Sequence, residues 1–566
     1  MTQSQTRTRI FAALVVAATV VLVVIAASGV APPLFSDDRP AEPTTEDTVG
    51  YVEGYWHDDE LAVDDGDDAT LEDDDLESVV YRSMARVEEI RGLTFEEEVP
   101  VDVISREEFQ ADHDDVFVSL SDDQQLKQNV AYEALFMVDS ETDASDELES
   151  MYGGTVLGYY EPTADRIVLV SDDPDEPDVD EVVLGHELTH ALQDQHFDLT
   201  RFDGGTIDRE TAETGLIEGD AVWVDTEYDE RCGEEWSCLP DPESPGEQQA
   251  DLNWGLYLTL YHPYSDGPSY VDQLRESGDG WDVVDAAYDD PPESSSTIIH
   301  HEAREPVAVD VPDRSSDAWE PLEIDGEVVT ERVGEAAMVG MFGGDPLDPT
   351  TESVIDDEAL LADDSSDYDY DQPYTNDWAG DELVTYVDAD AGTNATADET
   401  GYVWETEWRS TEGAQEFATG YLELLELHDA EAVDDRQDTY VIDDEFPGAY
   451  YLEHDGETMT IVHAPSVDDL DAIASGAAPD GEDTVEQVDV AADDDSDSLS
   501  GFAVPGTVVT LGVAVIAVRR RARPVPERAE PTRVSTVDAA SPLGHTTGPD
   551  ASAGSSDPGR VRTTPL

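Results

Sequence analysis

The sequence predicts an α+β fold with two units, residues 76–310 and 320–475, flanked by two transmembrane segments. In the first unit, segments with strand-like alternation precede segments with helical spacing, which is typical of helices packed on a small sheet. In the second unit short strands and helices recur, so we expect a smaller α/β domain. Long apolar runs near both ends of the chain bracket the two units.

The first unit is expected to begin with a helix, because Leu76, Val80, Met84 and Val87 recur on one helical face. The helices that end the unit follow its strands, as the α+β class requires. The other predicted elements are a strand at 99–104, a helix at 122–137, two strands at 155–160 and 166–170 joined by a turn, and helices at 181–196 and 208–228.

The second unit combines a helix with short strands. Phe417, Tyr421 and Leu424 would share one side of a helix at 412–427, which predicts that this side packs on a sheet. The other predicted elements are a strand at 404–408 and a hairpin with strands at 450–452 and 459–462.

Composition defines the remaining parts of the chain. Residues 36–75 are acidic and poor in apolar side chains, so we expect a linker there, with order beginning near Leu76. The other divisions are an N-terminal apolar segment at 1–35, an acidic stalk at 476–500, a C-terminal apolar segment at 501–518 and, at 519–566, a tail rich in Pro, Ser, Thr and Gly that we expect to be disordered.

Arginines flank both apolar segments. The first segment follows Arg7 and Arg9 and predicts an uncleaved signal anchor or, given the small residues at 26–28, a cleaved signal peptide. The second precedes an arginine cluster at 519–523. Because basic flanks favour the cytoplasmic side, we expect an anchor in the cell membrane with both main units outside the cell.

Charge is the most unusual property of the chain. It has 138 acidic and 26 basic residues, a formal net charge of −112, and Lys127 is its one lysine. Such a charge repels itself in dilute buffer, but at molar salt the screening length falls to about 3 Å. The composition resembles that of proteins from extremely halophilic archaea. An acidic disordered protein is the alternative, which the folded patterning disfavours. Nucleic acid is excluded as a partner, because phosphates would be repelled.

The C-terminal apolar segment carries a second resemblance. Ser500-Gly501-Phe502, the apolar run and the following arginines resemble the C-terminal sorting signal of haloarchaeal surface proteins, and the acidic stalk fits that pattern. Ser500 stands where the signal has proline, and a further tail follows the arginines. We therefore expect a membrane anchor, with sorting to the cell surface as the alternative.

The chain has two cysteines, Cys232 and Cys238. Outside the cell, cysteines this close can form a small disulfide loop, and two free thiols are the alternative. Two sulfur atoms are too few for a sulfur-ligated metal site.

The segment His186-Glu187-Leu188-Thr189-His190 is an HExxH motif. Residues four apart share a helical face, so both imidazoles can reach one Zn²⁺ ion, and Glu187 can act as general base on a water that the metal activates. A surface helix with two solvated histidines is the alternative. Apolar residues on both sides of the motif favour a buried helix, where a metal is the simplest shared partner of two histidines.

A catalytic zinc needs a third protein ligand, and Glu218 is the leading candidate. It lies among small residues that would let a second helix approach the first. The other candidates are Glu213, Asp220 and His196.

Residues 186–197 followed by 216–221 resemble gluzincin-type metallopeptidases, which occur in bacteria and, as surface proteins, in haloarchaea. The resemblance implies a zincin-like domain with His186, His190 and Glu218 as zinc ligands. It also implies that the strand at 158–162 is the edge on which an extended substrate pairs. Weaker similarity continues at 291–300, with His301 where the group has proline, and at 378–381, 404–408 and 448–451.

Two further roles complete the predicted site. Gluzincins often stabilise the oxyanion with a histidine or tyrosine, and His300 is the candidate for this catalytic role, with a structural or exposed histidine as the alternative. Asp194 or Asp220 is the candidate to orient a zinc-bound imidazole.

The leading hypothesis is therefore a membrane-anchored extracellular zinc metallopeptidase acting on peptides or proteins. A non-catalytic, zinc-containing surface protein is the second hypothesis, and an adhesion module based on residues 320–475 is the third. The intact Glu187 and the absence of cysteines near the motif favour catalysis.

Overall fold

The computed structural model describes residues 39–490, with gaps at 67–68, 112–119, 153–155, 175, 203, 243–251, 345–351, 362–367, 392–394, 397–398 and 444. Both predicted transmembrane segments, the sorting signal and the tail lie outside these residues. Within the described part of the chain, every helix is too short or too polar to cross a bilayer. The described chain is a mixture of helices and sheets, as the α+β prediction requires.

A three-stranded sheet lies beside the helix that carries the HExxH motif. Its order is β3 (Val101–Ser105), β5 (Arg166–Ser171) and β4 (Gly158–Glu161). β3 runs parallel to β5, and β4 runs antiparallel to it. The turn predicted between the last two strands is present, and β4 forms one edge of the sheet.

The two predicted site helices are α7 (Glu181–Phe197) and α8 (Ile207–Arg231), and they pack against each other. Asp180 caps α7 by accepting the backbone N–H groups of Val182 and Val183. Close packing depends on glycine, because a Cβ atom at Gly185 would lie 3.1 Å from the Tyr228 ring of α8. α7 is buried along most of its length, which the apolar flanks of the motif predicted.

Buried arginines fix the start of α7. Arg82 and Arg86 lie on α2 (Asp73–Arg91), and each forms an ion pair with Glu181, at 3.1 Å and 2.6 Å. All three side chains are at least 97 % buried. Because a buried charge without its partner is very unfavourable, these pairs strongly determine where α7 begins.

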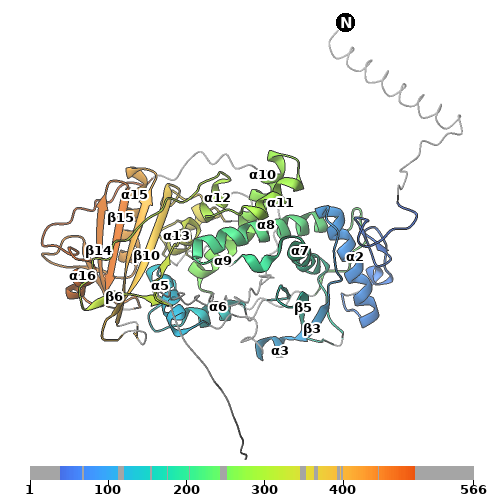
Figure 1. Ribbon diagram of the computed structural model, residues 1–566, viewed down its shortest axis with the longest axis horizontal. Coiled ribbons are helices and arrows are strands. Elements are labelled where there is room, and N and C mark those ends of the chain that lie inside the picture. Colours follow the sequence, from blue (N-terminus) through green and yellow to red (C-terminus); the bar gives the residue numbers. More distant parts are fainter. Residues whose placement is uncertain are drawn as a thin grey trace, which may run out of the picture. The chain divides into compact units, whose positions relative to one another are not determined.

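Further helices surround this centre (Figure 1). They are α3 (Arg106–Ala111), α5 (Asp122–Ala134), α6 (Ala144–Tyr152), α9 (Trp254–Ser265), α10 (Gly267–Ser277), α11 (Trp281–Asp289) and α12 (Ser295–His300), with short 3₁₀ turns η1 (Ala62–Asp65) and η2 (Leu199–Arg201). The run from α9 to α12 had no sequence prediction. α9 is apolar on most sides and contains Pro263, so it lacks the polar face that marks an amphipathic helix.

The second unit is built on an antiparallel sheet. Its strands follow the order β12 (Glu431–Ala432), β13 (Thr439–Ile442), β14 (Gly448–Asp455), β15 (Thr458–Ala464), β11 (Thr400–Trp408), β10 (Trp378–Asp388) and β6 (Trp319–Pro321), with β9 (Thr330–Glu331) also paired to β10. The predicted hairpin is β14–β15, and the predicted helix is α15 (Thr411–Leu427). A separate hairpin, β7 (Glu323–Ile324) with β8 (Glu327–Val328), and α14 (Asp357–Leu360) complete the described elements.

Helices cover both faces of this sheet. Trp404 of β11 packs with Phe417 and Tyr421 of α15, whereas its neighbour Val403 packs with Leu470 of α16 (Val467–Ile473) on the other face. This alternation follows the two-residue period of a strand.

The two predicted units share one hydrophobic core. The largest core cluster joins Leu258 of α9 and Met338 of α13 (Glu335–Phe342) to Trp404 and Phe417. α5 and α13 lie between the large sheet and helices α8 and α9 (Figure 1). The hydrophobic core is therefore continuous across the boundary predicted between the two units.

The predicted linker is also corrected, because the described residues from 39 onward fold onto α2. β1 (Tyr51–Val52) pairs with β2 (Tyr55–Trp56), and Val52 is fully buried. Asp64 forms an ion pair with the buried Arg82 at 2.6 Å, and the N–H of Gly50 donates to Glu88 at 2.9 Å. The acidic composition of residues 36–75 suggested a solvated segment, but Asp64 is the ion-pair partner of an arginine inside the fold.

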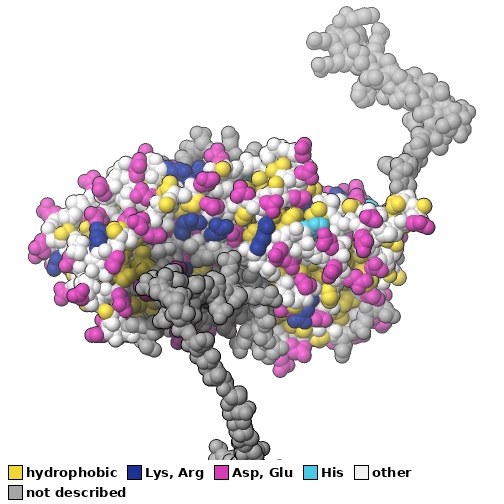
Figure 2. Space-filling view, in the orientation of Figure 1, with side chains coloured by type: hydrophobic (Ala, Val, Ile, Leu, Met, Phe, Trp, Pro, Cys, Tyr) yellow, Lys and Arg dark blue, Asp and Glu magenta, His cyan; other side chains and the backbone are white. Residues whose placement is uncertain are grey.

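Acidic side chains are spread over the visible face of the molecule, with few basic ones among them (Figure 2). On this face the acidic side chains thus belong to the folded part of the chain, which fits the expected dependence on high salt.

Candidate metal centre

α7 and α8 bring together the three predicted metal ligands. The Nε2 atoms of His186 and His190 lie 3.1 Å apart, one helical turn from each other on α7. The Oε2 atom of Glu218, from α8, lies 3.2 Å from the first of these nitrogens and 3.4 Å from the second. The three residues are buried, with 6 %, 0 % and 1 % of their surface exposed. Among the described residues they form the one group of this kind that could hold a metal ion.

The spacing of these atoms fits zinc. Ligand atoms at about 2.0–2.1 Å from a tetrahedral zinc ion lie roughly 3.3 Å from one another. The observed separations of 3.1 to 3.4 Å match that triangle. Two imidazole nitrogens and a carboxylate oxygen at one buried point are best satisfied by a shared cation.

Hydrogen bonds fix the orientation of both histidine rings. Nδ1 of His186 lies 2.8 Å from Oδ2 of Asp225, and Nδ1 of His190 lies 2.9 Å from Oε1 of Gln193. Gln193 in turn donates to the carbonyl of Ile217 on α8. When Nδ1 carries the proton and donates it, each Nε2 atom keeps a lone pair that points at the metal position. This arrangement is common in zinc sites.

Neither aspartate predicted to orient a ring does so. Asp194 accepts the Tyr160 hydroxyl at 2.8 Å, and Asp220 pairs with Arg91 at 2.9 Å. Asp225 has this role instead. The sequence signal was its spacing of seven residues from Glu218, which is two helical turns, but an acid-rich helix contains many such pairs.

The other candidate ligands have different partners. Glu213 accepts the N–H of Gly204 at 3.0 Å and pairs with Arg209 at 2.8 Å. His196 contacts the Thr94 carbonyl at 2.9 Å. Glu218 is therefore the ligand that the fold favours, and its pKa reflects this: burial opposes ionisation, but His190 and His186 outweigh it and lower the pKa to about 2.

Glu187 lies beside the triad and is 1 % exposed. One of its oxygens accepts a hydrogen bond from the backbone N–H of Tyr160, and burial raises its pKa. Its Oε2 atom is buried and has no hydrogen-bond partner among the described residues. A buried carboxylate oxygen without a partner is costly, so this atom is suited to a water or substrate proton at the site.

The free edge of β4 passes next to Glu187. The hydrogen bond from Val170 to the Leu157 carbonyl sets the alternation of the ladder, so the backbone groups of Gly158 and Tyr160 face away from β5. At Gly158 a Cβ atom would lie 3.5 Å from the Cγ atom of Glu187. The edge predicted to pair with substrate thus runs beside the predicted base: among the described strands only β5 pairs with β4, and Glu187 holds the Tyr160 N–H.

His300 has partners outside the triad. Its Nε2 atom lies 2.8 Å from Oε1 of Glu335 on α13, and its Nδ1 atom lies 3.7 Å from Asp371. The structure brings together His186, Glu187, His190 and Glu218, and it engages His300 in a different cluster. The oxyanion role of His300 stays a prediction.

Cys232 and Cys238 form a disulfide, one of the two predicted alternatives. Within the closed loop the Ser237 carbonyl accepts from Arg86 at 2.8 Å, and directly after it the N–H of Leu239 donates to Glu181 at 2.8 Å. The loop therefore supports the ion pairs that fix the start of α7.

Comparison with known proteins gives one match. A family model described as a domain of unknown function (DUF8575) matches residues 320–474, which agrees with the predicted extent of the second unit. No curated protein and no solved structure matches the chain.

Proposed function

We propose that this protein is an extracellular, membrane-anchored zinc metallopeptidase that hydrolyses peptide bonds with Glu187 as general base. One observation carries the proposal: three buried ligand atoms 3.1 to 3.4 Å apart lie beside a buried Glu187 oxygen that has no partner among the described residues. A structural zinc site would be closed by a fourth protein ligand. Among the described residues, no fourth His, Cys or acidic side chain joins the triad, so a position remains for water and substrate.

When bound, zinc at this position would supply a Lewis acid that lowers the pKa of water and polarises a peptide carbonyl. Glu187 moves the proton. Its Oε2 atom takes the proton of the attacking water, while its other oxygen stays held by the Tyr160 N–H. The same carboxyl then passes the proton to the leaving nitrogen. Burial raises the pKa of Glu187, which makes it a stronger base than an exposed glutamate.

A peptide substrate would add as a strand to the free edge of β4. The outward backbone groups of Gly158 supply hydrogen bonds, and the missing side chain lets the substrate lie close to Glu187. This placement brings a backbone carbonyl to the metal without requiring a particular side chain, so it suits peptides and unfolded proteins in general.

The proposed location rests on several features. The arginine-flanked apolar segments favour a membrane anchor with the described residues outside the cell. The disulfide fits an oxidising exterior. The acidic surface favours operation at high salt.

The test uses the full-length chain in molar KCl, with zinc content and cleavage of a quenched fluorescent peptide pool as readouts. Wild type should hold about one zinc and cleave the pool. Glu187→Gln should keep the zinc and lose cleavage by at least about 1,000-fold, because the proton carrier is gone. Glu213→Gln is the matched control and should behave as wild type. Equal cleavage by wild type and Glu187→Gln would refute the mechanism, and zinc without any cleavage would favour a non-catalytic surface protein.

A further inference from the structure

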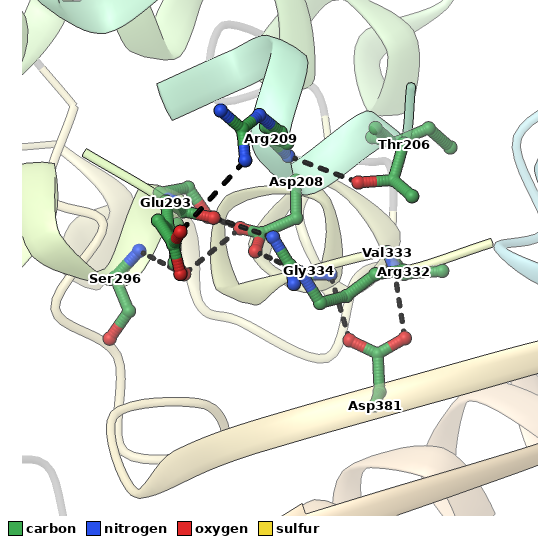
Figure 3. Close-up of polar contacts among 12 residues, drawn as sticks. Thr206, Asp208, Arg209, Glu293, Ser296, Arg332, Val333, Gly334 and Asp381 are labelled. Atoms are coloured by element: carbon green, nitrogen blue, oxygen red, sulfur yellow. Dashed lines mark hydrogen bonds and ion pairs between the residues drawn. The ribbon is translucent and has the colours of Figure 1, made fainter. Parts of the chain in front are cut away.

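The 320–474 unit reaches the start of α8 through a buried polar junction (Figure 3). We propose that Arg332 and Asp381 of this unit are positioning residues for Glu218: they hold α8 where its carboxylate meets the two histidines. The inference rests on the proposed metal site. It assigns to the domain of unknown function a role in assembling that site.

The second unit supplies acceptors for the first turn of α8. The N–H of Ile207 donates to Oε1 of Glu331 at 2.6 Å, and the N–H of Asp208 donates to the Arg332 carbonyl at 3.0 Å. Thr206 caps the helix by accepting the N–H of Arg209 at 3.3 Å. The first four N–H groups of a helix have no partner inside it, so the second unit satisfies two of these four.

Asp208 is the centre of the junction and is fully buried. Its Oδ2 atom accepts from Nε of Arg332 at 2.8 Å. Its Oδ1 atom accepts from the Ser294 hydroxyl at 3.1 Å and from the N–H and hydroxyl of Ser295 at 2.8 and 2.7 Å. Arg332 also donates to the Glu293 carbonyl at 2.5 Å. Loss of Arg332 would leave a buried carboxylate without its counter-charge, so the segment must move or take up a proton.

Asp381 of β10 holds the segment that carries Arg332. It accepts the backbone N–H groups of Val333 at 2.9 Å and Gly334 at 3.0 Å, and the indole N–H groups of Trp378 and Trp404 at 3.1 Å each. Figure 3 shows the two bonds from Asp381 to residues 333–334, and the four donors together fix this segment relative to the large sheet.

The contact across the junction leaves no room for a side chain at Gly334. Its φ of 81° is in the left-handed region, and a Cβ atom there would lie 2.1 Å from Oδ1 of Asp208. The backbone of the second unit therefore presses directly on the first turn of α8.

The junction is connected to Glu218 by two rigid paths. The first is α8 itself, in which Glu218 lies eleven residues after Ile207, a rise of about 16 Å. The second is α12, which starts at Ser295 and packs Ile298 against Gly215, where a Cβ atom would lie 3.1 Å from the Ile298 side chain. Gly215 is less than one turn from Glu218. Because ligand distances tolerate only about 0.2 Å, a small shift of α8 should weaken metal binding.

The test compares zinc Kd, from competition with a chromogenic chelator, in the full-length chain in molar KCl. Arg332→Gln should raise Kd by about 10-fold, the lower end of the effect of groups that support metal ligands. Arg332→Lys keeps the charge but loses the fork geometry, and it should raise Kd less; this milder variant serves if the glutamine variant does not fold. Arg436→Gln is the matched control, since Arg436 lies in the same unit and donates to a backbone carbonyl far from α8 in sequence.

Thermal midpoints distinguish a role in positioning Glu218 from a role in overall stability alone. A lowered midpoint with an unchanged zinc Kd in both Arg332 variants would overturn the inference and leave the proposed function intact. A weakened zinc Kd at a temperature where the variant is fully folded supports it, even if no cleavage is found. Wild type that binds no zinc would overturn the proposed site and the inference together.

Discussion

Asp225 lies seven residues after Glu218 on the same helix, and its carboxylate meets the Nδ1 atom of His186 at 2.8 Å. One helix therefore provides a ligand and the group that orients another ligand. Asp225→Asn should weaken zinc binding by about 10- to 100-fold with little loss of fold, because the amide can still accept the ring N–H but carries no charge. Chelator competition measures this, with the exposed Asp229→Asn on the same helix as control. An unchanged zinc Kd would show that Asp225 does not support the site.

The assignment of Glu218 rather than Glu213 as the third ligand can be tested by comparing a glutamine substitution at each position. Glu218→Gln removes the anionic ligand and should weaken zinc binding more than Asp225→Asn does, beyond about 100-fold. Glu213→Gln should leave the zinc Kd within about 2-fold of wild type, since its carboxylate binds Gly204 and Arg209 instead. Isothermal titration with zinc measures both. The reverse order of effects would mean that Glu213, not Glu218, completes the site.

The local parts of this site follow from sequence. HExxH spacing predicts that His186, Glu187 and His190 share one site, because this is a short-range helical relationship. Glu218 lies on the next helix, and the small residues around it marked it as the candidate third ligand. Asp225 was missed because the chain offers an acid at almost every helical spacing. α9 was missed because a helix buried on several sides loses the amphipathic period.

Long-range polar contacts could not be predicted in the same way. The pairing of Asp208 with Arg332 spans more than a hundred residues of sequence, and nothing local marks either side chain as buried. The ion pair of Asp64 with Arg82 spans only 18 residues, but nothing local marks it either, and it turned an expected linker into part of the fold. In a chain with 138 acidic residues, composition predicts a solvated surface and hides the few carboxylates that lie inside.

The disulfide loop should affect the free energy of unfolding more than it affects the affinity for metal. Replacing both cysteines by serine opens a seven-residue loop and should cost about 2 kcal/mol of the free energy of unfolding by the chain-entropy estimate. The loop also supports Glu181 and Arg86, so the loss should shift the thermal midpoint of the whole unit. Melting curves of wild type with and without reductant, beside the double serine variant, measure this. Identical midpoints in all three would show that the bond carries no stability.

The raised pKa of the buried Glu88 carboxyl predicts how stability depends on pH. Burial raises its pKa from 4.5 to about 8, against the effect of N–H groups from Phe95, Gly50 and Tyr51. Because the folded-state pKa lies above the unfolded value, the folded chain holds a proton that the unfolded chain releases between these two pH values. This group therefore favours folding fully below about pH 4.5, and that contribution declines as the pH rises toward about 8.

Glu88→Gln should remove this part of the pH dependence, since the amide resembles the protonated acid and does not titrate. The stability difference between wild type and Glu88→Gln should then change in favour of the variant as the pH rises from 5 to 8. Denaturant unfolding in molar KCl at several pH values measures it. Glu89→Gln, which removes a carboxylate at the exposed neighbouring position of the same helix, is the control. A constant difference for Glu88→Gln would mean that Glu88 is ionised in the folded protein and that its three backbone donors outweigh its burial.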